Sequence, residues 1–216
     1  MDVSHLVQTA AIHALPVLFA ITLHEAAHGY VARYFGDLTA HAQGRISLNP
    51  ARHIDLIGTI VVPLAMLLLS GGRFLFGWAK PVPVNVSALR RPKRDMMWVA
   101  AAGPGANLAM ALGWALLLKL AVTLPPNVFS VPLRLMGEAG ILVNLVFMFL
   151  NLVPILPLDG GRILAGLLPN RLAWQYAKLE PWGMPLLILL LATNVLDGVL
   201  GPLVGLSEGL IRAMVL

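Results

Sequence analysis

The sequence contains no cysteine, and few of its residues are charged or aromatic. Without cysteine, disulfide bonds and thiolate metal ligands are excluded, so any zinc must be held by His, Asp or Glu. Charged residues make up 12% and aromatic residues 7% of the 216 positions, whereas soluble domains carry about 25% charged residues. Because the aromatics do not interleave with a basic stripe, we expect no nucleic-acid partner.

Hydrophobic residues make up 58% of the chain, and the mean hydropathy is +0.82. Such a composition is typical of a membrane protein. The net charge is +5, but the basic residues lie between apolar segments, where the bias of Lys and Arg toward the cytoplasmic side accounts for them. The most basic stretch, residues 88–95, is therefore interpreted as a cytoplasmic loop rather than a lipid-recognition patch.

Several apolar segments approach the roughly 20 residues needed to cross a bilayer. The uncharged stretches cover residues 6–23, 98–118, 139–158 and 181–196. Residues 57–72 are apolar but short, and residues 73–86 alternate apolar side chains with two prolines, which is typical of an edge strand or hairpin. We expect an all-α membrane protein that forms a single domain over residues 1–216. It would be a polytopic bundle of about 4–6 transmembrane segments, with a re-entrant segment and a short β-hairpin around residues 57–86.

A candidate metal site interrupts the first apolar segment. His24 and His28 are four positions apart, so on a helix their imidazoles share one face and reach one metal ion. Glu25 follows the first of them, where its carboxylate can contact a metal-activated water. Ionisable side chains at membrane depth are costly, by at least about 2.5 kcal/mol for the charged types. We therefore interpret this turn as a metal site rather than as ordinary helix polarity.

Catalytic zinc usually has three protein ligands, so a third must come from elsewhere. The candidates are His5, His13, His41, His53, Asp55, Glu138 and Asp159. Asp159 stands out because it follows twenty uncharged residues and lies in NLVPILPLDGGR, where two prolines should interrupt a helix. Broken backbone at membrane depth is tolerated only beside protein or a water-filled cavity. The alternative is a carboxylate that caps a turn at the interface.

Several motifs together resemble the site-2 protease family of intramembrane zinc metalloproteases. They are HEAAHGYVARYFGD, GRISLNPARHIDLIGT, GWAKPVPVN, AAGPGANLAMA and NLVPILPLDGGRIL, which span residues 19–164. HExxH alone is moderately specific, whereas its pairing with a distant N-x-x-P-x-x-P-x-D-G is much more so. The chain looks like a compact member of that family, without a PDZ or CBS domain.

The resemblance implies one Zn²⁺ per chain, with His24, His28 and Asp159 as its ligands. It implies that Glu25 is the catalytic glutamate and that Asn151 lies near the metal and helps to stabilise the oxyanion. Asn107 also matches a family motif, and its role is open between function and helix packing. His53 lies in a matching segment and is expected to be structural.

The expected function is zinc-dependent endopeptidase cleavage in or near the transmembrane segments of membrane proteins, as in regulated intramembrane proteolysis. Its partners would be substrates with a transmembrane helix and the lipid bilayer; the oligomeric state is open. A divalent-metal transporter that uses the same intramembrane ligands is an alternative. So are a non-catalytic membrane binding protein and a zinc hydrolase that acts on a lipid-soluble substrate.

The expected location is the plasma membrane of a prokaryote, which the chain crosses several times. If His24, His28 and Asp159 share a metal, the loops that follow them must lie on the same side. This requires that residues 57–84 make no net crossing. The basic residues then gather on that side, which is the cytoplasmic one by the positive-inside rule. The zinc is accordingly expected nearer the cytoplasmic face.

Overall fold

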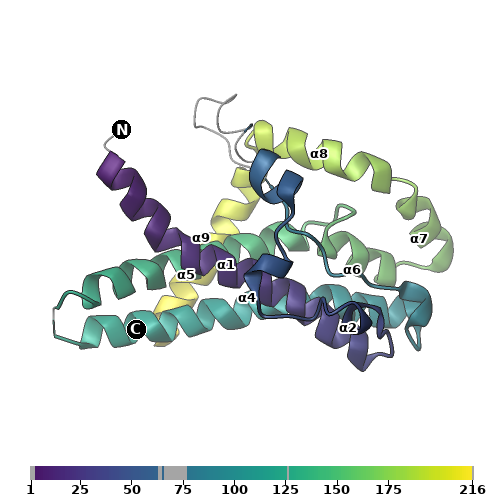
Figure 1. Cartoon of the computed structure of the whole chain (residues 1–216). Helices are drawn as coiled ribbons and strands as arrows, with labels where there is room; N and C mark the ends of the chain where they lie inside the picture. Colours follow the sequence, from purple (N-terminus) through teal and green to yellow (C-terminus); the bar gives the residue numbers. More distant parts are fainter. Residues whose placement is uncertain (1–2, 63–64, 66–76, 126, 216) are drawn as a thin grey trace.

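A computed structural model describes residues 3–62, 65, 77–125 and 127–215, with the side chains of residues 3–10 and 60 left out (Figure 1). Within these residues the chain forms helices and connecting loops, and no strand occurs among them. The long helices are α1 (Val3–Tyr34), α4 (Pro92–Thr123), α5 (Ser130–Leu152) and α9 (Val195–Val215). The shorter ones are α2 (Thr39–Ala42), α6 (Asp159–Leu167), α7 (Asn170–Ala177) and α8 (Glu180–Ala192), with single turns at η1 (Pro50–Arg52), η2 (Leu56–Val61) and η3 (Val86–Ala88).

Three of the described helices, α4, α5 and α9, are long and apolar enough to cross a membrane. Helix α8 is also apolar but has only 13 residues. The all-helical character predicted from the sequence is confirmed for the described residues, and the three apolar helices indicate a membrane protein. The predicted number of about 4–6 spans is not confirmed.

Helices α4 and α5 run side by side and form the centre of the fold, with α1 and α9 packed against them (Figure 1). Their shared core consists of Ala111, Trp114, Ala115, Leu118, Ile141, Leu145, Met148, Val204 and Ile211. Small residues let these helices approach closely. At Gly140 of α5, for example, a Cβ would overlap the Trp114 ring of α4.

Residues 53–59 and 78–80 lie beside each other, although 18 residues separate the two stretches along the chain. The Trp78 N–H donates to the Gly58 carbonyl at 3.0 Å, and the Lys80 N–H donates to the His53 carbonyl at 2.9 Å. The chain therefore leaves this point at residue 59 and returns to it at residue 78. Of the predicted re-entrant segment, residues 63–64 and 66–76 lie outside the described residues.

The predicted β-hairpin is not confirmed. The residues before Pro81 and Pro83 favour extended backbone, and Asn85 is extended, but in the described part of the chain residues 77–85 form no strand. Pro81 and Pro83 have no N–H to donate to a ladder. The backbone N–H groups of Val82 and Asn85 donate to the side chains of Glu25 and Asp37 rather than to a neighbouring strand.

Asp37 fixes this extended segment to the end of α1. The side chain is fully buried, and it accepts hydrogen bonds from the backbone N–H groups of Thr39 at 2.9 Å and Asn85 at 2.6 Å. Burial alone would raise the pKa of Asp37, but the hydrogen bonds from Thr39 and Asn85 outweigh it and lower the pKa below its usual value. The ionised carboxylate thus holds the start of η3 against the turn that follows α1.

Candidate metal centre

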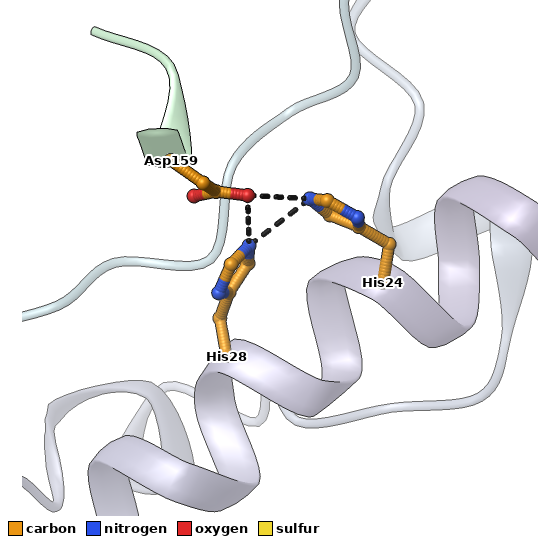
Figure 2. A group of neighbouring side chains, drawn as sticks. All are labelled: His24, His28 and Asp159. Carbon is orange, nitrogen blue, oxygen red and sulfur yellow. Dashed lines mark hydrogen bonds and ion pairs between the residues drawn. The ribbon is translucent and has the colours of Figure 1, made fainter. Parts of the chain in front are cut away.

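Helix α1 presents His24 and His28 on successive turns of one face (Figure 2). Small residues, Ala20, Ala26 and Ala32, are almost completely buried around this part of the helix. Ala32 packs with Val99 of α4, and both imidazole rings are held inside the protein. The His24 and His28 side chains are 10% and 12% exposed.

Asp159 reaches the same point from the opposite side (Figure 2). Helix α5 ends at Leu152, and Asp159 is the first residue of α6. The connection in between folds tightly against the start of α6. At Gly160 a Cβ would overlap the Leu152 carbonyl, and at Gly161 it would lie 2.5 Å from the Leu156 nitrogen. The two glycines after Asp159 therefore permit the backbone packing that places its carboxylate.

The three side chains converge on one small volume. The Nε2 atoms of His24 and His28 are 3.1 Å apart, and Asp159 Oδ2 lies 3.2 Å from the first and 3.4 Å from the second. Ligands of a tetrahedral zinc, each about 2.0–2.2 Å from the metal, lie about 3.3–3.6 Å from one another. The observed separations match that geometry to within a few tenths of an ångström.

The surroundings of these atoms also suit a cation. Asp159 Oδ2 is buried and has no hydrogen-bond partner among the described residues, and the Nε2 atoms of the two imidazoles lie next to it. A buried carboxylate oxygen is normally paired or bound to a metal. Two neutral imidazoles and one carboxylate form a donor set typical of catalytic zinc, with a fourth position left for water or substrate. The residues present therefore fit zinc.

Both imidazoles are oriented by hydrogen bonds on their far nitrogens. His24 Nδ1 lies 2.6 Å from Asn107 Oδ1, and His28 Nδ1 lies 2.7 Å from the Val99 carbonyl. Since both partners are acceptors, each Nδ1 carries the proton and each Nε2 offers its lone pair toward Asp159. Such partners fix the tautomer and the ring orientation of histidines that bind metals.

Asn107 is itself held by a second buried amide. Its Nδ2 donates to Asn144 Oδ1 at 3.0 Å, and Asn144 Nδ2 donates to the Gly140 carbonyl at 2.8 Å. Both asparagines are completely buried. These bonds require that Asn107 turn its oxygen toward His24. Of the two roles left open for Asn107, packing and function, the contacts connect it directly to His24 of the candidate metal centre.

Glu25 lies beside the cluster and is bound to the extended segment. Its Oε2 accepts a hydrogen bond from the backbone N–H of Val82 at 2.8 Å. The side chain is half-buried, so its charge is partly shielded from solvent. An acceptor held in one place next to the two imidazoles of the candidate metal centre suits a general base.

Among the described residues, Asn151 makes no hydrogen bond to His24, His28 or Asp159. Its Nδ2 donates to the Phe147 carbonyl one turn earlier in α5, at 3.0 Å.

The other described ligand candidates are not part of the group that can hold a metal, and the side chain of His5 lies outside the described residues. His53 is buried, with Nε2 2.9 Å from the Ser47 carbonyl. Asp55 accepts from the Gly58 N–H at the start of η2, and Glu138 pairs with Arg134. Within the described residues, the group that can hold a metal consists of His24, His28 and Asp159.

Several residues around the site have no role that the sequence alone predicts. The most important is Gly103 of α4, where a Cβ would lie 2.5 Å from His24 Cε1 and from His28 Nε2. The AAGPGANLAMA motif contains Gly103 and could have indicated this close contact, because glycine permits a close approach to the backbone. The Val99 carbonyl and the Val82 N–H are backbone groups, so no side-chain pattern reveals them.

Comparisons with known proteins identify relatives that are all named as putative zinc metalloproteases. The chain is 36% identical over 192 residues to "Putative zinc metalloprotease YwhC" of Bacillus subtilis, covering 88% of this chain and 84% of that protein. It is 29% identical over 184 residues to "Putative zinc metalloprotease Rip2" of Mycolicibacterium smegmatis, covering 83% of this chain and 66% of that protein. The match to Rip2 of Mycobacterium tuberculosis H37Rv is 29% over 185 residues, with 84% and 66% covered. No protein-family model and no solved structure matches the chain.

Proposed function

The chain belongs to the site-2 protease family of zinc metalloproteases, and from this premise we propose that it is an intramembrane endopeptidase. It would cleave peptide bonds in or near the transmembrane segments of other membrane proteins, as in regulated intramembrane proteolysis. The observation that carries this proposal is the convergence of His24, His28 and Asp159 within 3.4 Å, beside Glu25. The site lies among helices of which three are apolar and long enough to cross a membrane.

We assign His24 Nε2, His28 Nε2 and Asp159 Oδ2 as the ligands of one Zn²⁺ per chain. Bound zinc would supply a Lewis acid that polarises the scissile carbonyl and lowers the pKa of water toward about 7. The hydrogen bonds from His24 to Asn107 and from His28 to Val99 keep both lone pairs directed at that position. The preorganised rings reduce the reorganisation needed on binding.

Glu25 acts as general base and then as general acid. Its carboxylate accepts a proton from the attacking water and passes it to the leaving amine. Asn151 is assigned to the developing oxyanion. One Nδ2 proton of Asn151 is used by the Phe147 carbonyl, and the other remains to donate to a substrate oxygen.

A helical substrate poses a separate problem, because its peptide groups are satisfied internally and shielded in lipid. A cleavable segment must therefore unwind near the site. The extended segment 77–85 passes beside Glu25, where it would pair with the freed backbone groups of an unwound substrate. This is strand addition, in which main-chain hydrogen bonds supply affinity.

We place the enzyme, as a single domain, in the plasma membrane of a prokaryote, with the zinc nearer the cytoplasmic face. The contact between Gly58 and Trp78 supports this orientation, since the chain returns to its starting point between them. With no net crossing there, the loop after α1 and the loop before α4 share a side. Both carry basic residues, as expected for cytoplasmic loops.

The test compares wild type with Glu25→Gln, reconstituted in vesicles and offered a panel of single-span substrates. The wild type should cleave and bind one zinc per chain. Glu25→Gln should keep its zinc and lose cleavage by about 100-fold or more, because only the proton acceptor is removed. Zinc flux without cleavage in the wild type would instead support a transporter and refute the proposal.

A further inference from the structure

One peptide group links Glu25 to a guanidinium on a different loop. The Val82 N–H donates to Glu25 Oε2 at 2.8 Å. On the other side of the same peptide group, the Pro81 carbonyl accepts from Arg45 Nη2 at 3.2 Å, and the adjacent Lys80 carbonyl accepts from the same nitrogen at 3.0 Å. Because the peptide group is planar, fixing its carbonyl also fixes the direction of its N–H.

The sequence restricts which N–H can fill this role. Pro81 and Pro83 carry none, so Val82 supplies the sole backbone donor of residues 81–83. The Val82 side chain is buried and lies over Gly29, where a Cβ would be 3.2 Å from Val82 Cγ1. The packing of the Val82 side chain on α1 and the hydrogen bond from its N–H to Glu25 thus fix the same position of residue 82 along α1.

We propose that Arg45 is a positioning residue for Glu25, acting through the Pro81–Val82 peptide group. The guanidinium polarises the two carbonyls with charge-assisted hydrogen bonds. A polarised peptide group is a stronger donor at its N–H, so the Val82 bond to the Glu25 carboxylate strengthens in turn. Glutamate has three rotatable side-chain bonds, and this contact holds the carboxylate beside His24 and His28.

Since this role rests on the proposed function of Glu25 as base, removing Arg45 should affect the chemical step and not zinc binding. None of the hydrogen bonds of Arg45 involves His24, His28 or Asp159. A misplacement of about 1 Å in a catalytic group costs about 100-fold in rate. We expect Arg45→Ala to lower kcat by about 10- to 100-fold, with KM for a single-span substrate within about twofold. Arg45→Lys, which keeps a charged donor, should recover a large part of that loss.

The coupling is tested with a second variant that removes the donor itself. Val82→Pro deletes the N–H and keeps an extended backbone, whereas Val82→Ala keeps the N–H and loses only side-chain packing. Val82→Pro should lower kcat about as much as Arg45→Ala, and Val82→Ala should lower it less. If Arg45 acts through this N–H, the double variant Arg45→Ala/Val82→Pro loses no more than the worse single variant. Losses that multiply would show independent roles and overturn the proposal.

Hydrogen exchange supplies a readout that needs neither substrate nor turnover. Residues 81–84 contain only two amide hydrogens, those of Val82 and Val84, because residues 81 and 83 are prolines. In Arg45→Ala the Val82 amide should exchange at least about tenfold faster, and in Arg45→Lys it should stay close to wild type. Unchanged exchange in Arg45→Ala would overturn the proposal even if no substrate were cleaved.

The two possible failures are distinguishable. A wild type that cleaves nothing contradicts the proposed function and leaves the exchange measurement to decide the contact. A wild type that cleaves, with Arg45→Ala equal to it in kcat, contradicts the role of Arg45 alone. If Arg45→Ala loses zinc or fails to fold, Val82→Pro measured against Val82→Ala supplies the test, and equal kcat in these two variants contradicts the role of the Val82 N–H.

Discussion

A single methyl group added at Gly103 should abolish tight zinc binding while leaving the helix intact. The Cβ of Gly103→Ala would lie 2.5 Å from His24 Cε1 and His28 Nε2, and 2.6 Å from His24 Nε2. Non-bonded carbon atoms normally stay about 3.5 Å apart or more, so the rings must move by about 1 Å. Metal–ligand distances tolerate only about 0.2 Å. We expect the zinc affinity to fall at least about 100-fold, or about 2.8 kcal/mol.

The matched control is Gly105→Ala, two positions further along α4. Apart from the backbone of its own helix turn, a Cβ at Gly105 meets no atom within 4 Å. Both variants should gain about 1 kcal/mol of helix propensity, so a general defect of helix α4 cannot account for a difference between them. The assay is competition with a chelator of known zinc affinity, accompanied by thermal unfolding of the metal-free protein. Wild-type zinc affinity in Gly103→Ala would refute the proposed position of the metal.

Three further predictions follow from individual contacts. Asn107→Ala removes the acceptor for His24 Nδ1 and should weaken zinc binding by about 10- to 100-fold in the same competition assay; unchanged affinity would contradict the role of that bond. Asp37→Asn should lower the Tm at pH 7. The pKa of Asp37 is depressed in the folded protein, so its carboxylate stabilises the fold at pH values above the unfolded pKa of about 3.9, and this stabilisation is lost as the pH falls through the folded pKa. The Tm values of wild type and Asp37→Asn should therefore converge in strong acid. A Tm difference independent of pH would contradict this. The chain has no cysteine of its own, so His41→Cys and Arg91→Cys each introduce a single one. A thiol reagent that does not cross the membrane should label both variants from the same side. Labelling of the two variants from opposite sides would refute the proposed topology.

Much of the candidate site was predictable because its signals are local in the sequence. The four-residue spacing of His24 and His28 needs only a helix to place both rings on one face. Asp159 was distinguished by a long uncharged stretch followed by prolines and glycines, which marks broken backbone. The structure brings these three side chains together, although more than 130 residues separate His24 from Asp159.

Contacts that depend on tertiary packing were not predictable in the same way. The alternation and prolines of residues 73–86 predicted an edge strand or hairpin, which is not confirmed, because the N–H groups of Val82 and Asn85 meet the side chains of Glu25 and Asp37 instead of a partner strand. No sequence period encodes such a partner. The same holds for Gly103, since the motif around it indicates close packing without saying what lies opposite.

The central claim is that two imidazoles and one distant carboxylate bind a single metal ion. The most direct measurement is the zinc stoichiometry and affinity of wild type and Asp159→Asn, a change that keeps the side-chain shape and removes the charge. The account predicts one zinc per chain in the wild type and a loss of affinity of about 100-fold or more in the variant. Equal zinc affinity in the two proteins would contradict it.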